Sequence, residues 1–120
     1  MKQNNTSQTV AVIHTAFEDK PSTVAFVKTK EGMSLNEKLE YAYRWTNNVM
    51  GSWSIKKEFF DDGEPNGDFN PNVTVMKPTE VIDGKEWGHR STSVGDQMLV
   101  GNKKYVVASF GFETLEGEPV

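Results

Sequence analysis

The feature that most constrains the fold is a pair of β-branched runs early in the chain, TVAVIHTAF at residues 9–17 and TVAFVKTK at residues 23–30. The segment between them, EDKPS, has the proline, serine and aspartate typical of a turn. Two such runs across a short turn predict a β-hairpin. The first run is nearly apolar on both of its faces, which predicts a strand in the centre of a sheet.

One helix is predicted directly after this hairpin. Ser34 is a good N-cap, and Glu37 three residues later completes a capping box, in which each side chain accepts a hydrogen bond from the backbone amide of the other residue. Apolar side chains then recur at helical spacing on the face that we expect to meet the sheet, namely Leu35, Leu39, Ala42 and Trp45. Two asparagines and a glycine within residues 47–51 predict the end of the helix.

The rest of the chain has the pattern of short strands joined by turns. Trp53 and Ile55 alternate with serines, which hints at a strand, and residues 61–72 form a loop dense in glycine, proline and asparagine. We expect a strand over residues 72–77, a tight turn at residues 83–84, and a second hairpin from residues 97–100 and 105–112. This order predicts an α+β fold, an antiparallel sheet of about five strands with one main helix packed on it.

The 120 residues fit a single domain. We expect a flexible N-terminus over residues 1–8, one α+β domain over residues 9–114 and an acidic tail over residues 115–120. The first residues lack the apolar core of a signal peptide, and no apolar run has the length of a membrane span. The absence of cysteine suits a reducing compartment, so we expect a cytoplasmic protein that does not bind membranes.

The loop over residues 61–72, which we call the acidic loop, is close to a calcium-binding motif. Counted from Asp62, oxygen-bearing side chains stand at the first, third, fifth, seventh and ninth positions and Gly67 at the sixth, as in an EF-hand loop. The twelfth position, which should supply a bidentate glutamate, is Val73. The match is therefore partial, so the sequence neither predicts nor excludes calcium binding by residues 62–72.

Patterns typical of catalysis are also incomplete. His89 stands near Ser91 and Ser93, yet neither the glycine pattern of a nucleophile elbow nor a third partner accompanies them. Arg90, the Ser-Thr-Ser string after it and the Glu-Gly-Glu at residues 116–118 are superficially similar to arginine-specific ADP-ribosyltransferases, but there the arginine belongs on an earlier strand. We therefore predict no catalytic residue, metal ligand or cofactor, and a protein that is not an enzyme.

Two polar stretches carry the candidate binding residues. Residues 41–53, YAYRWTNNVMGSW, combine tryptophan, tyrosine and arginine, the residue types that dominate binding hot spots. Residues 89–96, HRSTSVGD, which we call the glycine–acid corner, end in Gly95-Asp96. The Asp96 carboxylate is expected to bond local amides before the last hairpin. The alternative is that the residues of both stretches stabilise the fold and do not bind a partner. The candidate binding residues are Arg44, Asn47, Asn48, Trp53, Arg90, Ser91, Ser93 and Asp96.

Three stretches taken in order, YRWTNNVMGSWS, NPNVTVM and HRSTSVGDQMLVGNKKYVVASFGF, resemble a family of small, mostly uncharacterised proteins encoded by bacteriophages and mobile elements. The resemblance covers residues 39–112 and rests mainly on residues 90–96 and 110–112. It implies a context and no mechanism, namely a phage protein that works in the cytoplasm of the infected bacterium.

Small size, acidic charge and this implied context favour a non-enzymatic accessory protein that binds and modulates or inhibits a host or defence protein. The alternative is a nucleic-acid or nucleotide-binding module with a small barrel of the PUA or ASCH type, to which the glycine–acid corner is weakly similar. Such a module would use Arg44 and Arg90. A net charge of −4, from 13 basic and 17 acidic residues, disfavours nucleic acid as the partner.

Overall fold

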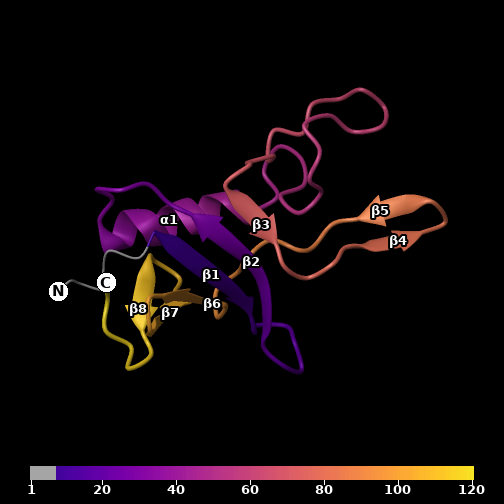
Figure 1. Cartoon of the computed structure of the whole chain (residues 1–120). Helices are drawn as coiled ribbons and strands as arrows, with labels where there is room; N and C mark the ends of the chain where they lie inside the picture. Colours follow the sequence, from indigo (N-terminus) through magenta and orange to yellow (C-terminus); the bar gives the residue numbers. More distant parts are fainter. Residues whose placement is uncertain (1–7) are drawn as a thin grey trace.

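The computed structural model describes residues 8–120, so the expected flexible N-terminus lies outside the described residues except for Gln8. One helix packs on a six-stranded sheet whose neighbouring strands are all antiparallel, and a separate two-stranded sheet projects from this body (Figure 1). The predicted α+β class is confirmed. The elements are β1 (Thr9–His14), β2 (Ser22–Lys28), α1 (Leu35–Trp45), β3 (Val73–Val75), β4 (Glu80–Ile82), β5 (Lys85–Trp87), β6 (Gln97–Val100), β7 (Lys103–Val107) and β8 (Phe112–Thr114).

The first strand lies in the centre of the main sheet, as its two apolar faces predict. The strand order is β3-β2-β1-β6-β7-β8, and both predicted hairpins, β1–β2 and β6–β7, are present. The main sheet has six strands instead of about five because the short strand β8 forms a separate edge. β1 ends at His14, short of the predicted residue 17, because the Thr15 and Ala16 amides bond the Asp96 carboxylate and leave the strand ladder.

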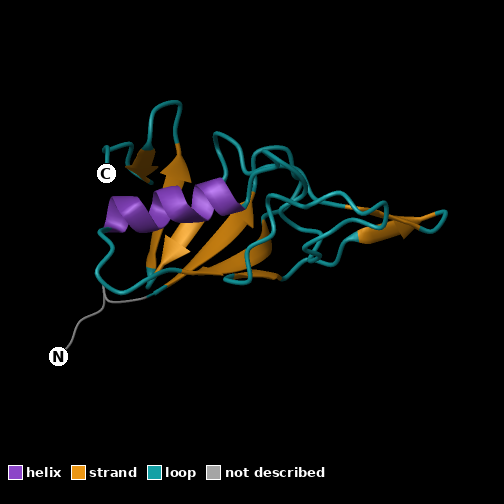
Figure 2. Cartoon of the chain, turned by 90° about the horizontal axis from the view of Figure 1, so that it is seen from above, coloured by secondary structure: helices purple, strands orange, loops and turns teal. Residues whose placement is uncertain are grey.

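The helix begins as predicted and lies across one face of the sheet (Figure 2). The Ser34 hydroxyl accepts from the Glu37 amide at 3.1 Å, and the Glu37 carboxylate accepts from the Ser34 amide at 2.8 Å. Leu39 and Ala42 are fully buried in the core, while the other two predicted inward residues pack against it half-buried. The Asn47 side chain donates to the carbonyl of Tyr43 and so helps to close the last turn.

Three expectations about the later chain need correction. Trp53 and Ile55 lie in a loop, where the Trp53 ring is fully buried, so the hinted strand is absent. The expected strand over residues 105–112 is divided between β7 and β8 by a turn in which Gly111 has a φ of 73°. Residues 115–120 are not a loose tail, because the amide of Val120 donates to the carbonyl of Phe112 and folds the segment back on β8.

The two-stranded sheet β4–β5, which we call the arm, stands away from the body in both views (Figures 1 and 2). Its turn is the predicted Asp83-Gly84 pair, with φ of 53° and 77°. Positive φ at both central residues is the geometry of a type I′ hairpin. Within residues 8–120, no helix combines the length and apolar character needed to cross a membrane.

Candidate functional site

The carboxylate of Asp96 is the centre of the glycine–acid corner and has no exposed surface. Its Oδ1 accepts from the amides of Thr15 (2.8 Å) and Ala16 (2.9 Å) and from Arg90 Nη2 (2.9 Å). Its Oδ2 accepts from the Ser93 amide (2.8 Å) and from Arg90 Nη1 (2.7 Å). Burial alone would raise the pKa of Asp96, but these hydrogen bonds hold it well below its usual range. A charged carboxylate therefore fastens the corner to the end of β1.

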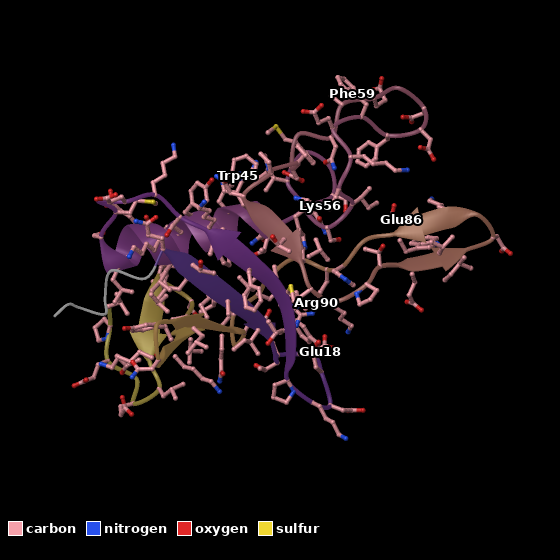
Figure 3. All side chains as sticks on the ribbon, in the orientation of Figure 1. Glu18, Trp45, Lys56, Phe59, Glu86 and Arg90 are labelled. Carbon is pink, nitrogen blue, oxygen red and sulfur yellow. The ribbon has the colours of Figure 1, made fainter. Side chains whose placement is uncertain are left out.

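Arg90 also contacts Glu18 and Phe17. Its Nε lies 3.3 Å from a carboxylate oxygen of Glu18, and its guanidinium carbon lies 5.0 Å from the ring centre of Phe17. Figure 3 shows Arg90 and Glu18 side by side near the base of the arm. The bidentate bond to Asp96 and the contact with Glu18 raise the pKa of Arg90, so the guanidinium stays charged.

A buried chain of hydrogen bonds links β1, the corner and the end of the helix. His14 Nε2 lies 3.0 Å from Thr92 Oγ1, Thr92 Oγ1 donates to Thr46 Oγ1 at 2.8 Å, and Thr46 Oγ1 donates to the Ala42 carbonyl at 2.7 Å. Because each hydroxyl has a single proton, this direction requires His14 to donate from Nε2. Burial lowers the pKa of His14 to about 4, against an opposing pull from Asp96, so the imidazole is neutral at pH 7.

The segment after the helix is joined to the corner by Trp53 and Asn48. The buried indole of Trp53 donates from Nε1 to the carbonyl of Arg90 at 2.9 Å, and its ring meets that of His14 edge-on. The Asn48 amide donates to the Ser91 hydroxyl at 2.9 Å, and its side chain accepts from the Trp53 amide. The two polar stretches of the sequence thus meet, and they do so through bonds that hold the fold.

Arg44 lies apart from this cluster. Its Nη1 donates to Asp68 Oδ1 at 3.2 Å, and its guanidinium stacks over the ring of Trp45. The other carboxylate oxygen of Asp68 accepts from the amides of Val49 and Met50. Arg44 therefore joins the helix to the acidic loop, and its bonding partners differ from those of Arg90.

The acidic loop is held by its buried polar side chains. Asn66 Oδ1 accepts from the amides of Ser52 and Asp68, and its Nδ2 donates to three carbonyls of the facing segment. The side chains at the fifth and seventh positions of the calcium-like pattern, Asn66 and Asp68, are thus bonded to protein groups. Over the described part of the chain, no group of three or more histidine, aspartate and glutamate side chains is placed to hold a metal ion.

Two of the predicted binding residues, Asp96 and Trp53, have no exposed surface. A side chain without exposed surface does not touch a partner, so for these two the binding hypothesis is wrong and the structural role replaces it. The other six have exposed or half-buried side chains that are bonded within the chain, and their contact with a partner stays a prediction. These six are Arg44, Asn47, Asn48, Arg90, Ser91 and Ser93.

The suggested serine–histidine pair does not form. His89 Nε2 bonds the carbonyl of Lys77 at 2.6 Å, while the Ser91 hydroxyl accepts from the Asn48 amide and the Ser93 hydroxyl donates to the carbonyl of Ser91. Both serines are therefore bonded to backbone groups, and neither meets a base.

A cleft that the sequence analysis missed lies between the acidic loop and the arm. Its volume is about 460 Å³. Glu86, labelled on the arm in Figure 3, lines one of its sides, and Asp61 and Asp62 of the acidic loop line the other. The lining residues are Ile55, Lys57, Phe60, Asp61, Asp62, Gly84, Lys85 and Glu86. The Asp-Gly turn in the sequence predicts a tight turn here, but no sequence signal shows that the hairpin stands away from the core.

The arm carries apolar side chains that its own two strands do not cover. Val81 is 67 % exposed, and Ile82 and Trp87 are each 51 % exposed. The register pairs Ile82 with Lys85 and Glu80 with Trp87, which places these four side chains on one face. The Lys85 ammonium lies 4.7 Å from the ring centre of Trp87. The arm thus presents an apolar face flanked by one acid and one base.

Comparison of the chain with models of protein families, with curated proteins and with solved structures finds no match. The resemblance to phage-encoded proteins therefore stays a prediction, and the functional argument rests on the geometry of the chain.

Proposed function

We propose that this protein is a non-enzymatic binding module that engages a protein partner through the arm and the adjoining cleft. The observation that carries the proposal is the exposed apolar face of the arm, where Ile82 and Trp87 lie together on a hairpin that projects from the body. Val81 is exposed on the other face of the same hairpin. An isolated two-stranded sheet is only marginally stable in water. A partner that covers this face would bury apolar surface and stabilise the hairpin at once.

The charges of the cleft favour a protein partner over a nucleic acid. Its lining has two lysines, Lys57 and Lys85, against three acids, Asp61, Asp62 and Glu86. A groove for a polyanion would carry a clear excess of positive charge. The two arginines that a nucleic-acid module would use, Arg44 and Arg90, are both bonded to buried carboxylates.

The proposed partner is a host or defence protein of a bacterium infected by a phage. This part of the proposal is supported by the resemblance of residues 39–112 to proteins of phages and mobile elements, and by the small acidic chain. Binding would modulate or inhibit that host protein by covering part of its surface.

Trp87 is the residue whose removal tests the proposal. A large aromatic side chain buries about 150–250 Å² when fully covered, so covering its exposed half removes about 100 Å² from water. At about 25 cal/mol per Å², this contributes about 2.5 kcal/mol, which is roughly a 50- to 100-fold change in affinity.

The experiment captures partners from a nuclease-treated bacterial lysate with the wild-type chain, with Trp87→Ser and with Phe17→Ser. Phe17 is a matched control, since it is an exposed aromatic residue outside the arm and the cleft. We expect a protein that the wild type and Phe17→Ser retain and Trp87→Ser loses, with all three chains folded by circular dichroism. Phe17→Ser also removes the ring beside Arg90, so its melting temperature should fall by a few degrees at most, at about 0.5–1 kcal/mol for such a contact. Equal capture by Trp87→Ser, or a protein that is captured from untreated lysate and is absent after nuclease treatment, would overturn the proposal.

A further inference from the structure

A second hollow surface, which we call the β7–β8 groove, is lined by residues of β7, β8 and the turn between them. Figure 1 shows these two strands at the end of the molecule opposite the arm. Its volume is about 390 Å³. It is formed by one side of α1, the glycine–acid corner and the turn between β7 and β8. The lining residues are Glu40, Tyr43, Val94, Val107, Ala108, Ser109, Gly111 and Phe112.

Most of the lining of the groove is apolar, and packing holds it in place. The rings of Tyr43 and Phe112 meet edge to face with centres 6.2 Å apart, and Phe112 and Val107 belong to the buried core. The Ala108 amide donates to the carbonyl of Gly111, which closes the β7–β8 turn. Phe110, within this turn, is 96 % exposed, the largest exposure of any large apolar side chain in residues 8–120.

The corner fixes Val94 at this groove. Val94 is the one aliphatic side chain of HRSTSVGD, and it is more than half exposed. On one side of it the Ser93 amide bonds Asp96, and on the other the Gly95 amide donates to the carbonyl of Val107. The buried Asp96–Arg90 network therefore positions an exposed apolar residue beside the turn that carries Phe110.

The charge of the groove indicates what it binds. Glu40 is the one charged residue of its lining, and it is exposed at the rim on the helix. An apolar floor beside a single carboxylate complements an apolar side chain that is followed or preceded by a cation. We infer that the β7–β8 groove is a binding site for a peptide segment in which a large apolar residue adjoins an arginine or a lysine. This site is separate from the arm and goes beyond the function proposed above.

The test is a titration of the ¹⁵N-labelled full chain with two capped dipeptides, acetyl-Phe-Arg-amide and acetyl-Phe-Gln-amide, followed by amide chemical shifts. We expect saturable shifts at Val94, Ser109 and Gly111 with both peptides. The arginine peptide should bind about two- to fivefold more tightly, the range of an exposed ion pair. Glu40→Gln should remove this preference, since it removes the carboxylate and keeps the shape of the side chain.

Two further variants separate the groove from the rest of the surface. Val94→Ser should weaken both peptides because Val94 lines the groove, while Phe59→Ser, an exposed phenylalanine that pairs with Pro65 of the acidic loop, should leave both affinities unchanged. All of these side chains are exposed, so melting temperatures should stay at the wild-type value. Absence of saturable shifts at millimolar peptide, shifts centred outside the groove, or equal affinity of the two peptides for the wild type would each overturn the inference.

Discussion

Replacement of Asp96 by asparagine should destabilise the fold more than any exposed acidic substitution. The asparagine keeps one acceptor oxygen and places an NH₂ group where the other oxygen was. In one orientation that group faces the Ser93 amide and Arg90 Nη1, and in the other it faces the amides of Thr15 and Ala16 and Arg90 Nη2. Donors face donors either way, so at least two hydrogen bonds to a charged acceptor are lost.

The magnitude follows from these bonds. A hydrogen bond to a charged group contributes about 1.5–3 kcal/mol, and breaking a buried ion pair from one side costs about 3–5 kcal/mol. Arg90 is partly exposed and retains Glu18, so we expect a loss of about 3–4 kcal/mol for Asp96→Asn. For a chain of 120 residues this lowers the melting temperature by roughly 12–16 °C, at about 4 °C per kcal/mol.

The assay is thermal and urea unfolding followed by circular dichroism at pH 7, with Asp61→Asn as the matched control. The Asp61 carboxylate is 90 % exposed and pairs only with the exposed Lys57 among the bonds seen in residues 8–120, so its replacement should leave the melting temperature nearly unchanged. A decrease of less than about 4 °C for Asp96→Asn, equivalent to about 1 kcal/mol, would refute the structural role given to the corner.

Three further predictions concern the buried histidine, the helix cap and the acidic loop. In the folded chain the pKa of His14 is lowered from 6.5 to about 4, so the unfolded chain binds more protons between these two pH values. This contributes about 3 kcal/mol to the free energy of unfolding above pH 6.5, and the contribution should be lost as the pH falls toward 4. His14→Gln should make the free energy of unfolding from urea titrations depend less on pH over this range. Ser34→Ala removes half of the capping box and should lower the free energy of unfolding by about 1 kcal/mol in the same assay, while Ser34→Asp should retain most of it. Asn66→Ala leaves the facing amides and carbonyls without their partner, so the amides of residues 49–68 should exchange hydrogen faster than in the wild type while those of β1 stay protected. An equal change in exchange rate in both segments would contradict this.

The sequence predicts the elements that are determined by residues within a few positions of one another in the chain. The β-branched runs, the Ser34–Glu37 box and the Asp83-Gly84 turn each determine structure within a few residues, and each is found where the pattern places it. The inward positions of the helix follow from its period alone. Strand limits are less predictable, since the end of β1 depends on Asp96, which is distant in sequence.

The roles of the polar residues depend on contacts that no local pattern contains. Asp96 is expected to bond its own turn, and it does through Ser93, but it also binds the end of β1 and Arg90. The hot-spot composition around Trp53 reflects a buried indole that holds the corner, because tryptophan serves cores and interfaces alike. The cleft and the groove arise where the arm and the β7–β8 turn meet other segments, which only the three-dimensional arrangement shows.

The most direct test of the central claim is hydrogen exchange of the chain alone and in complex with the protein that it captures. The two-stranded arm is expected to exchange rapidly in the free chain, because it lacks a covering layer. The account predicts that the amides of residues 80–87 become strongly protected in the complex, while those of the corner at residues 89–96 change little. Unchanged exchange in the arm, with new protection concentrated at the corner, would contradict it.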